Sequence, residues 1–297
     1  MTAGISTWPS AGTATVKAAS GATATGTAPF QVATPNVGTA LRQVPWNDPT
    51  VTQFCKLSAR PLPLQHTFLM SSFTTYQASV LNGYPAACRA ALVDMEPATP
   101  AQLDTFLATC AAAGLKMWIT LAHNPTSKFA TAADYFTWLA PLVPIVRKHG
   151  YPHVVDFTDY EVYKKDAHVS WTPVPPNTPD DLTDMLGQEF YADGYYGYSS
   201  RLDKLAAYAD SIGKPFCVDE IGADQQTTTV AQGTEFFTYA LDWLQARVAA
   251  GKTPPLVCAW NGGKGANPAY TGYAAATEPA AWLDLYGQMY DTVAALA

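Results

Sequence analysis

The chain has 297 residues, of which 48% are hydrophobic and 14% are charged, and its formal net charge at pH 7 is -7. This apolar content is sufficient for a large buried core and excludes a disordered chain. The negative charge and the lack of any basic run argue against nucleic acid and anionic membranes as partners, because both attract clustered Lys and Arg. No apolar stretch reaches the roughly 18 residues that a membrane span needs, so no membrane insertion is expected.

The first residues, "MTAGISTWPS", have neither a basic region nor an apolar region, so we expect no Sec-type signal peptide. The five cysteines show no CxxC spacing, and we assign no metal ligand among the five histidines. The sequence therefore predicts no metal site and no cofactor.

From about residue 60 onward, a short apolar run is followed repeatedly by a loop and a helical stretch. The helical stretches have apolar residues spaced i, i+3, i+4, as in "TPAQLDTFLATCAAAG" and "GTEFFTYALDWLQARVAAG". Such alternation predicts parallel strands with helical crossovers. The predicted strands, in chain order, are "LPLQHTFLM", "AALVDMEP", "KMWITLAHNP", "HVVDFTDYE", "DMLGQEFY", "PFCVDEIG" and "PLVCAWNGG".

These seven strands, with an eighth in "AGISTW" at residues 3–8, are apolar throughout, which indicates that both faces of the sheet are covered. No GxGxxG turn follows any strand, so a closed (β/α)8 barrel is favoured over an open doubly wound sheet. We expect a single domain over residues 1–297. Residues 10–45 are rich in Ala, Thr and Gly and are predicted to form an irregular, low-complexity arm or loop that contacts other proteins.

In a barrel of this kind, the carboxyl ends of the strands meet at one mouth, where functional residues gather. The residue types at these ends are acids, amides and aromatics, without Lys or Arg. Phosphate ligands would favour cations or a Gly-rich loop, whereas carboxylates and aromatic rings suit sugars, and paired carboxylates perform glycoside hydrolysis. The candidates are Glu96, His123, Asn124, Glu161, Glu189, Tyr191, Glu220, Trp260 and Asn261.

Over residues 90–262, the order and spacing of four segments resemble the clan A glycoside hydrolases. These segments are "KMWITLAHNPTSKFATAADYFTWLAPLVPIVRKHG", "DMLGQEFY", "GKPFCVDEIG" and "PLVCAWNGG". The pattern is most similar to the β-mannanase type (family twenty-six) and its actinobacterial and phage-tail relatives. The resemblance implies a (β/α)8 barrel in which Glu220 is the nucleophile and Trp260 is the aromatic residue of strand eight. Tyr191 matches the tyrosine of strand six, and Glu189 replaces the aspartate of that strand.

The chain departs from this pattern at Asn124, which stands where the resemblance implies the acid/base glutamate. A carboxamide cannot transfer a proton, so the usual acid is missing. Glu161 and Glu96 are the candidate replacements. Neighbouring Asp219 is expected to point away from the mouth, on the opposite face of its strand from Glu220.

Two hypotheses remain open. In the first, the barrel binds a cell-envelope or other β-linked polysaccharide, as a virion (phage-tail) component or an extracellular protein that contacts other virion or assembly proteins through its arm. In the second, the chain is a retaining endo-glycosidase in which Glu220 is the nucleophile and Glu161 or Glu96 is the acid/base. The substrate-binding residues in both are His123, Asn124, Glu189, Tyr191, Trp260 and Asn261.

Overall fold

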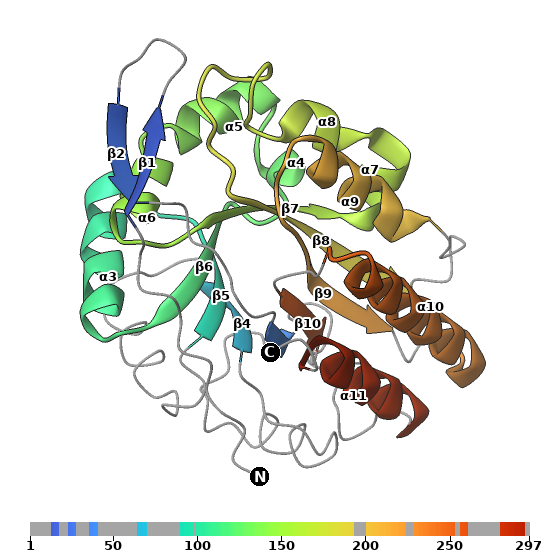
Figure 1. The fold of residues 1–297 in the computed structure, drawn as a ribbon. Coiled ribbons are helices and arrows are strands. Elements are labelled where there is room, and N and C mark those ends of the chain that lie inside the picture. Colours follow the sequence, from blue (N-terminus) through green and yellow to red (C-terminus); the bar gives the residue numbers. More distant parts are fainter. Residues whose placement is uncertain are drawn as a thin grey trace.

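A ring of eight parallel strands forms the centre of the protein. The computed structural model describes residues 13–17, 23–27, 36–40, 64–69, 90–97, 99–192, 200–223, 228–252, 256–260 and 280–294. The strands pair in the order β10-β3-β4-β5-β6-β7-β8-β9 and the ring closes between β9 and β10 (Figure 1). Their bounds are β3 (Asn36–Ala40), β4 (Leu64–Leu69), β5 (Ala90–Met95), β6 (Lys116–Leu121), β7 (His153–Thr158), β8 (Met185–Ala192), β9 (Phe216–Ala223) and β10 (Leu256–Trp260).

The predicted parallel sheet is confirmed, and its seven apolar runs correspond to β4 through β10. The remaining place in the ring belongs to β3, which pairs with β10 on one side and β4 on the other. This strand lies within residues 10–45, which we expected to be irregular. The same segment contains β1 (Thr13–Lys17) and β2 (Thr23–Thr27), which form a separate antiparallel pair. The strand expected at residues 3–8 lies outside the described residues, and the single-domain assignment stays a prediction.

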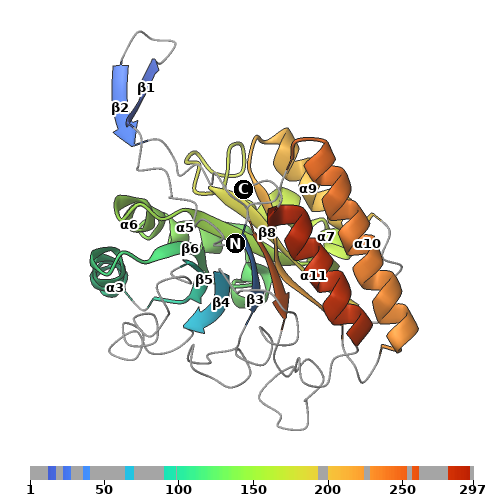
Figure 2. The ribbon, with the colours of Figure 1, turned by 60° about the horizontal axis from the view of Figure 1, so that its bottom comes forward.

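Helices follow the six strands from β5 to β10 and lie on the outside of the curled sheet (Figure 2). The segments that follow β3 and β4 lie outside the described residues, so the strand–helix repeat is described for six units. In chain order, the helices are α3 (Pro100–Ala112), α4 (Pro125–Lys128), α5 (Ala132–Leu139), α6 (Val143–Lys148), α7 (Asp159–Lys165), α8 (Ala167–Trp171), α9 (Arg201–Ser211), α10 (Val230–Ala249) and α11 (Ala280–Ala294).

The hydrophobic core lies between the outer face of the sheet and these helices. On β7, Val155 and Phe157 belong to this core, while Asp156 between them is buried outside it. On β5, Val93 and Met95 flank Asp94 in the same way. Since successive side chains of a strand point to opposite faces, the acids point into the ring. Within the described part of the chain, no helix combines the length and the apolar character needed to cross a bilayer.

Candidate functional site

Five carboxylic acids gather inside the ring, towards the carboxyl ends of β5, β7, β8 and β9. Asp94 comes from β5, Asp156 from β7, Glu189 from β8, and Asp219 and Glu220 from β9; each is between 1% and 7% exposed. Carboxylates are rarely buried unless they are paired or hydrogen-bonded, so such a group requires positive charge, protons or ligands close by. This end of the ring is also where barrel proteins place function.

A bulge in β9 brings two consecutive acids into this group. Gly187 on β8 pairs with Cys217 on β9, and Glu189 on β8 pairs with Glu220 on β9. Between these two pairs, β8 advances by two residues and β9 by three. The extra residue in β9 is Asp219 or its neighbour, and the shift changes which face the side chains occupy. The Asp219 carboxyl lies over Gly187, where a built Cβ would be 3.2 Å from Asp219 Cγ. The expectation that Asp219 points away from the mouth was therefore wrong.

Burial raises the pKa of Asp219 well above its usual value, and the nearby charges of Asp156, Glu189 and Glu220 raise it further. The pKa of Asp156 is also raised, because the effect of burial is larger than the opposing effect of the neighbouring His123. Desolvation and these neighbouring charges thus favour the neutral form of the Asp219 carboxyl. This is the behaviour expected of like charges that share one desolvated space.

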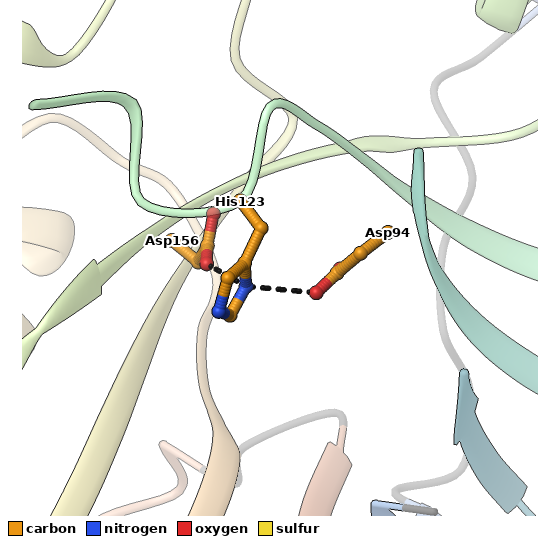
Figure 3. Close-up of side chains that lie close together, drawn as sticks. All are labelled: Asp94, His123 and Asp156. Atoms are coloured by element: carbon orange, nitrogen blue, oxygen red, sulfur yellow. Dashed lines mark ion pairs between the residues drawn. The ribbon is translucent and has the colours of Figure 1, made fainter. Parts of the chain in front are cut away.

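His123, which follows β6, contacts three of these acids, and Figure 3 shows two of them, Asp94 and Asp156. Its Nδ1 is 2.8 Å from Asp94 Oδ2 and 2.7 Å from Asp156 Oδ2, and its Nε2 is 2.8 Å from Glu189 Oε1. Burial alone would lower the pKa of His123, but the charges of Asp156, Glu189 and Asp94 raise it well above its usual value. The imidazole therefore links β5, β7 and β8 through their acidic side chains.

Asn124 directly follows the histidine and reinforces the same contacts. It has a left-handed backbone conformation (φ 53°, ψ 65°) that asparagine tolerates better than most residues. Its side-chain Nδ2 donates to Glu189 Oε1 over 2.7 Å, and its backbone N–H donates to Asp156 Oδ2 over 3.4 Å. One oxygen of Glu189 is thus contacted by both His123 and Asn124, which fixes the position of that side chain.

Tyr191 and Glu220 form the other polar contact at this end. The Tyr191 hydroxyl donates to Glu220 Oε2. The Tyr191 carbonyl accepts a hydrogen bond from the guanidinium of Arg201, which is buried and also pairs with Asp159. Glu220 and Glu189 are register partners on adjacent strands, so their side chains start about 5 Å apart.

The two acids proposed to replace the missing proton donor have local partners. Glu161 belongs to the capping box of α7, in which its carboxylate accepts from the Thr158 N–H at 3.0 Å and Thr158 Oγ1 accepts from the Glu161 N–H at 3.1 Å. The pKa of Glu161 is raised, because the effect of burial is larger than the opposing effect of the backbone hydrogen bond from Thr158. Glu96 forms an ion pair with Lys128 of α4.

The comparisons with known proteins concern the fold. No protein-family model matches the chain, and no curated protein matches it. Among solved structures, a GH128 (subgroup II) endo-β-1,3-glucanase from Pseudomonas viridiflava is 19% identical with a TM-score of 0.51, over 86% of this chain and 97% of that one. A GH26 endo-β-1,4-mannanase from Bacillus sp. JAMB-750 is 11% identical with a TM-score of 0.56, over 87% and 86%.

A third similar structure is a GH128 (subgroup I) endo-β-1,3-glucanase from Amycolatopsis mediterranei, in complex with laminaritriose. It is 12% identical with a TM-score of 0.51, over 86% of this chain and 99% of that one. The chain has the fold of the clan A glycoside hydrolases. The expected fold is therefore confirmed at the level of the clan, and the resemblance to the β-mannanase type specifically stays a prediction.

Of the sequence-predicted site residues, the structure brings together His123, Asn124 and Glu189, and separately Tyr191 and Glu220. Trp260 ends β10, and Asn261 lies outside the described residues. Sequence reasoning did not select Asp94 and Asp156. A lone acid within an otherwise apolar strand, as in "ALVDM" and "HVVDF", was the available signal, because such an acid must face the interior of the ring or disrupt the core.

Proposed function

We propose that the carboxyl-terminal mouth of this barrel binds a β-linked polysaccharide, and that binding is the function of the chain. The observation that carries the proposal is the contact of Asn124 with Glu189. At the position where the resemblance implies a proton donor, the chain has an amide that donates a hydrogen bond to a neighbouring carboxylate at 2.7 Å. An amide in this role supports ligand binding but cannot protonate a leaving group.

The chemistry of the mouth supports sugar as the ligand. The carboxyl groups of Glu189 and Glu220, the amide of Asn124 and the hydroxyl of Tyr191 can exchange hydrogen bonds with sugar hydroxyls. The fold supports the same choice, since the similar structures include endo-β-1,3-glucanases, one of them with laminaritriose bound, and endo-β-1,4-mannanases. The glycan that we propose is accordingly a β-1,3- or β-1,4-linked polymer.

A second candidate function is retaining hydrolysis, with Glu220 as nucleophile and Glu161 or Glu96 as acid/base. One observation favours it: Glu220 is buried and accepts a hydrogen bond from Tyr191, which would orient a nucleophile. Retention also needs a proton donor about 5–5.5 Å from the nucleophile. The capping box of Glu161 and the ion pair of Glu96 use those carboxylates locally, so binding is the better supported function.

The experiment measures binding and turnover on the same samples. The purified chain is titrated calorimetrically with laminarihexaose and mannohexaose, and reducing ends are assayed after prolonged incubation. We expect binding of one of these oligosaccharides without release of reducing ends. Glu220→Gln and Tyr191→Phe should weaken binding, and Glu235→Gln, on the exposed face of α10, should not.

Release of reducing ends that Glu220→Gln and Glu161→Gln both abolish would establish the hydrolase instead. Failure of the folded wild-type chain to bind any β-linked glucan or mannan would reject the proposal. A virion or extracellular setting, and contacts with other proteins through residues 10–45, stay predictions from the sequence.

A further inference from the structure

Asp94, His123 and Asp156 offer three donor atoms to one point inside the ring. One carboxylate oxygen from each aspartate and Nδ1 of the histidine all lie within 4.8 Å of one another. Figure 3 shows the two carboxylates approaching the imidazole from opposite sides, Asp94 from β5 and Asp156 from β7. Both aspartates are 1% exposed, so this is an interior cluster and not a group of solvated surface acids.

The charge of the cluster favours a cation. His123 can supply one positive charge, whereas three carboxylates lie within 2.8 Å of its ring nitrogens. Lys128 acts on Asp156 and Asp94 as a second positive charge, but it also pairs with Glu96, so four carboxylates face two cationic groups. An uncompensated buried carboxylate costs several kcal/mol, so a further positive charge at this point would stabilise the arrangement.

Asp156 provides an independent indication of a ligand. Its Oδ2 contacts Nδ1 of His123 at 2.7 Å. Its Oδ1 is buried and has no hydrogen-bond partner among the described residues. Buried polar atoms are satisfied in the great majority of cases, and an exception indicates a missing water, ion or catalytic role.

The surroundings of His123 match those of a metal-binding histidine. A ligating histidine usually donates its other ring N–H to a carboxylate, which fixes its tautomer and its orientation. Here Nε2 lies 2.8 Å from Glu189 Oε1, so Glu189 can hold the proton on Nε2, and a metal ion that displaces the proton of Nδ1 would find the lone pair of Nδ1 facing Asp94 and Asp156. Asn124 holds the same Glu189 oxygen with its amide.

We propose that Asp94, His123 and Asp156 bind one divalent first-row transition-metal ion, with Glu189 orienting the histidine. One imidazole nitrogen with two carboxylates suits Zn²⁺ or Mn²⁺, whereas Ca²⁺ and Mg²⁺ favour oxygen ligands alone. Three protein ligands leave at least one position for water or a ligand oxygen. The sequence predicted no metal site, because only the spacing of cysteines and histidines along the chain was considered. It does not depend on the proposed glycan binding.

The test uses the full chain. After treatment with EDTA and removal of the chelator, the protein is titrated with ZnCl2 and separately with MnCl2 by calorimetry. We expect a stoichiometry of one ion per chain and a higher Tm at saturation, because an ion that binds only the folded state stabilises it. Asp156→Asn and His123→Asn should weaken the affinity by more than 100-fold, and Glu189→Gln by about 10- to 100-fold.

Asp104→Asn is the matched control, because Asp104 contacts His149 at 2.6 Å and Lys148 at 2.9 Å but lies in a more exposed cluster. This variant should keep the wild-type affinity. Where a site variant fails to fold, anomalous diffraction from a Zn²⁺-soaked wild-type crystal decides the question, with the ion expected between Asp94, His123 and Asp156. No binding of either ion by the folded wild type, unchanged affinity in folded site variants, or an ion located elsewhere would overturn the proposal.

Discussion

Gly233 lies on the face of α10 that packs against α11, and its replacement by alanine should destabilise the protein through Trp282 (Figure 1). A Cβ built on Gly233 would lie 2.1 Å from Trp282 Cζ2 and 2.2 Å from Cε2. The indole is 1% exposed, its Nε1 donates to the Val230 carbonyl at 3.1 Å, and its ring packs against Phe237. A ring held in this way cannot move aside cheaply, so Gly233→Ala must displace it.

The magnitude follows from two opposing effects. Loss of a buried tryptophan from its site costs about 3–5 kcal/mol, consistent with burial of roughly 200 Å² at about 25 cal/mol per Å². Alanine in place of glycine inside a helix returns about 1 kcal/mol. Gly233→Ala should therefore lower the free energy of unfolding by about 2–4 kcal/mol.

The assay is urea unfolding of a double-mutant cycle that combines Gly233→Ala with Trp282→Ala. In the Trp282→Ala background the contact is gone, and Gly233→Ala should raise the free energy of unfolding by about 0.5–1 kcal/mol. The sign of the glycine substitution thus reverses between the two backgrounds. Equal destabilisation in both backgrounds would show that the indole does not occupy the space beside Gly233, and would refute the described packing of α10 on α11.

Two further substitutions test the interior of the barrel. His153 is fully buried and its Nδ1 contacts the Leu182 carbonyl at 2.6 Å; burial lowers its pKa from 6.5 to about 4. Below pH 6.5 the unfolded chain binds a proton that the folded chain excludes, so stability falls as the pH drops towards 4, by about 3 kcal/mol at 1.36 kcal/mol per unit. In urea unfolding at pH 8 and pH 4.5, His153→Asn should lose most of that decrease, and an unchanged decrease would contradict a neutral His153. Gly187→Ala places a Cβ 3.2 Å from the Asp219 carboxyl and 3.3 Å from Val154 Cγ1, and should cost about 1–3 kcal/mol by overpacking. The cost should be smaller in an Asp219→Ala background, where only the Val154 contact remains, and an undiminished cost there would contradict the contact with Asp219.

The strands from β4 to β10 were predictable because each is a run of apolar residues bounded by turn residues, and the mouth followed from the parallel order. Strand β3 was not predictable in the same way. Its sequence "NVGTA" has a single large apolar residue, and its place in the ring depends on pairing with β10 and β4, which are distant in sequence. Pairing and burial routinely override the weak intrinsic strand propensity of such a segment.

The site was predicted in part for similar reasons. Alternation along β9 places Glu220 inside and Asp219 outside, but the bulge that reverses this for Asp219 depends on the pairing with β8. The capping box of Glu161 was readable from the sequence, since "TDYE" has Thr158 three residues before a glutamate at the start of a helix. That signal favours a helix-capping carboxylate over an acid directed at the mouth.

A crystal structure of the wild-type chain soaked with laminarihexaose or mannohexaose tests the central claim most directly. We expect intact oligosaccharide at the carboxyl ends of β6 to β9, with sugar hydroxyls within hydrogen-bond distance of Asn124, Glu189 or Glu220. Oligosaccharide bound only at another face of the barrel, or none at concentrations that saturate a binding titration, would contradict it.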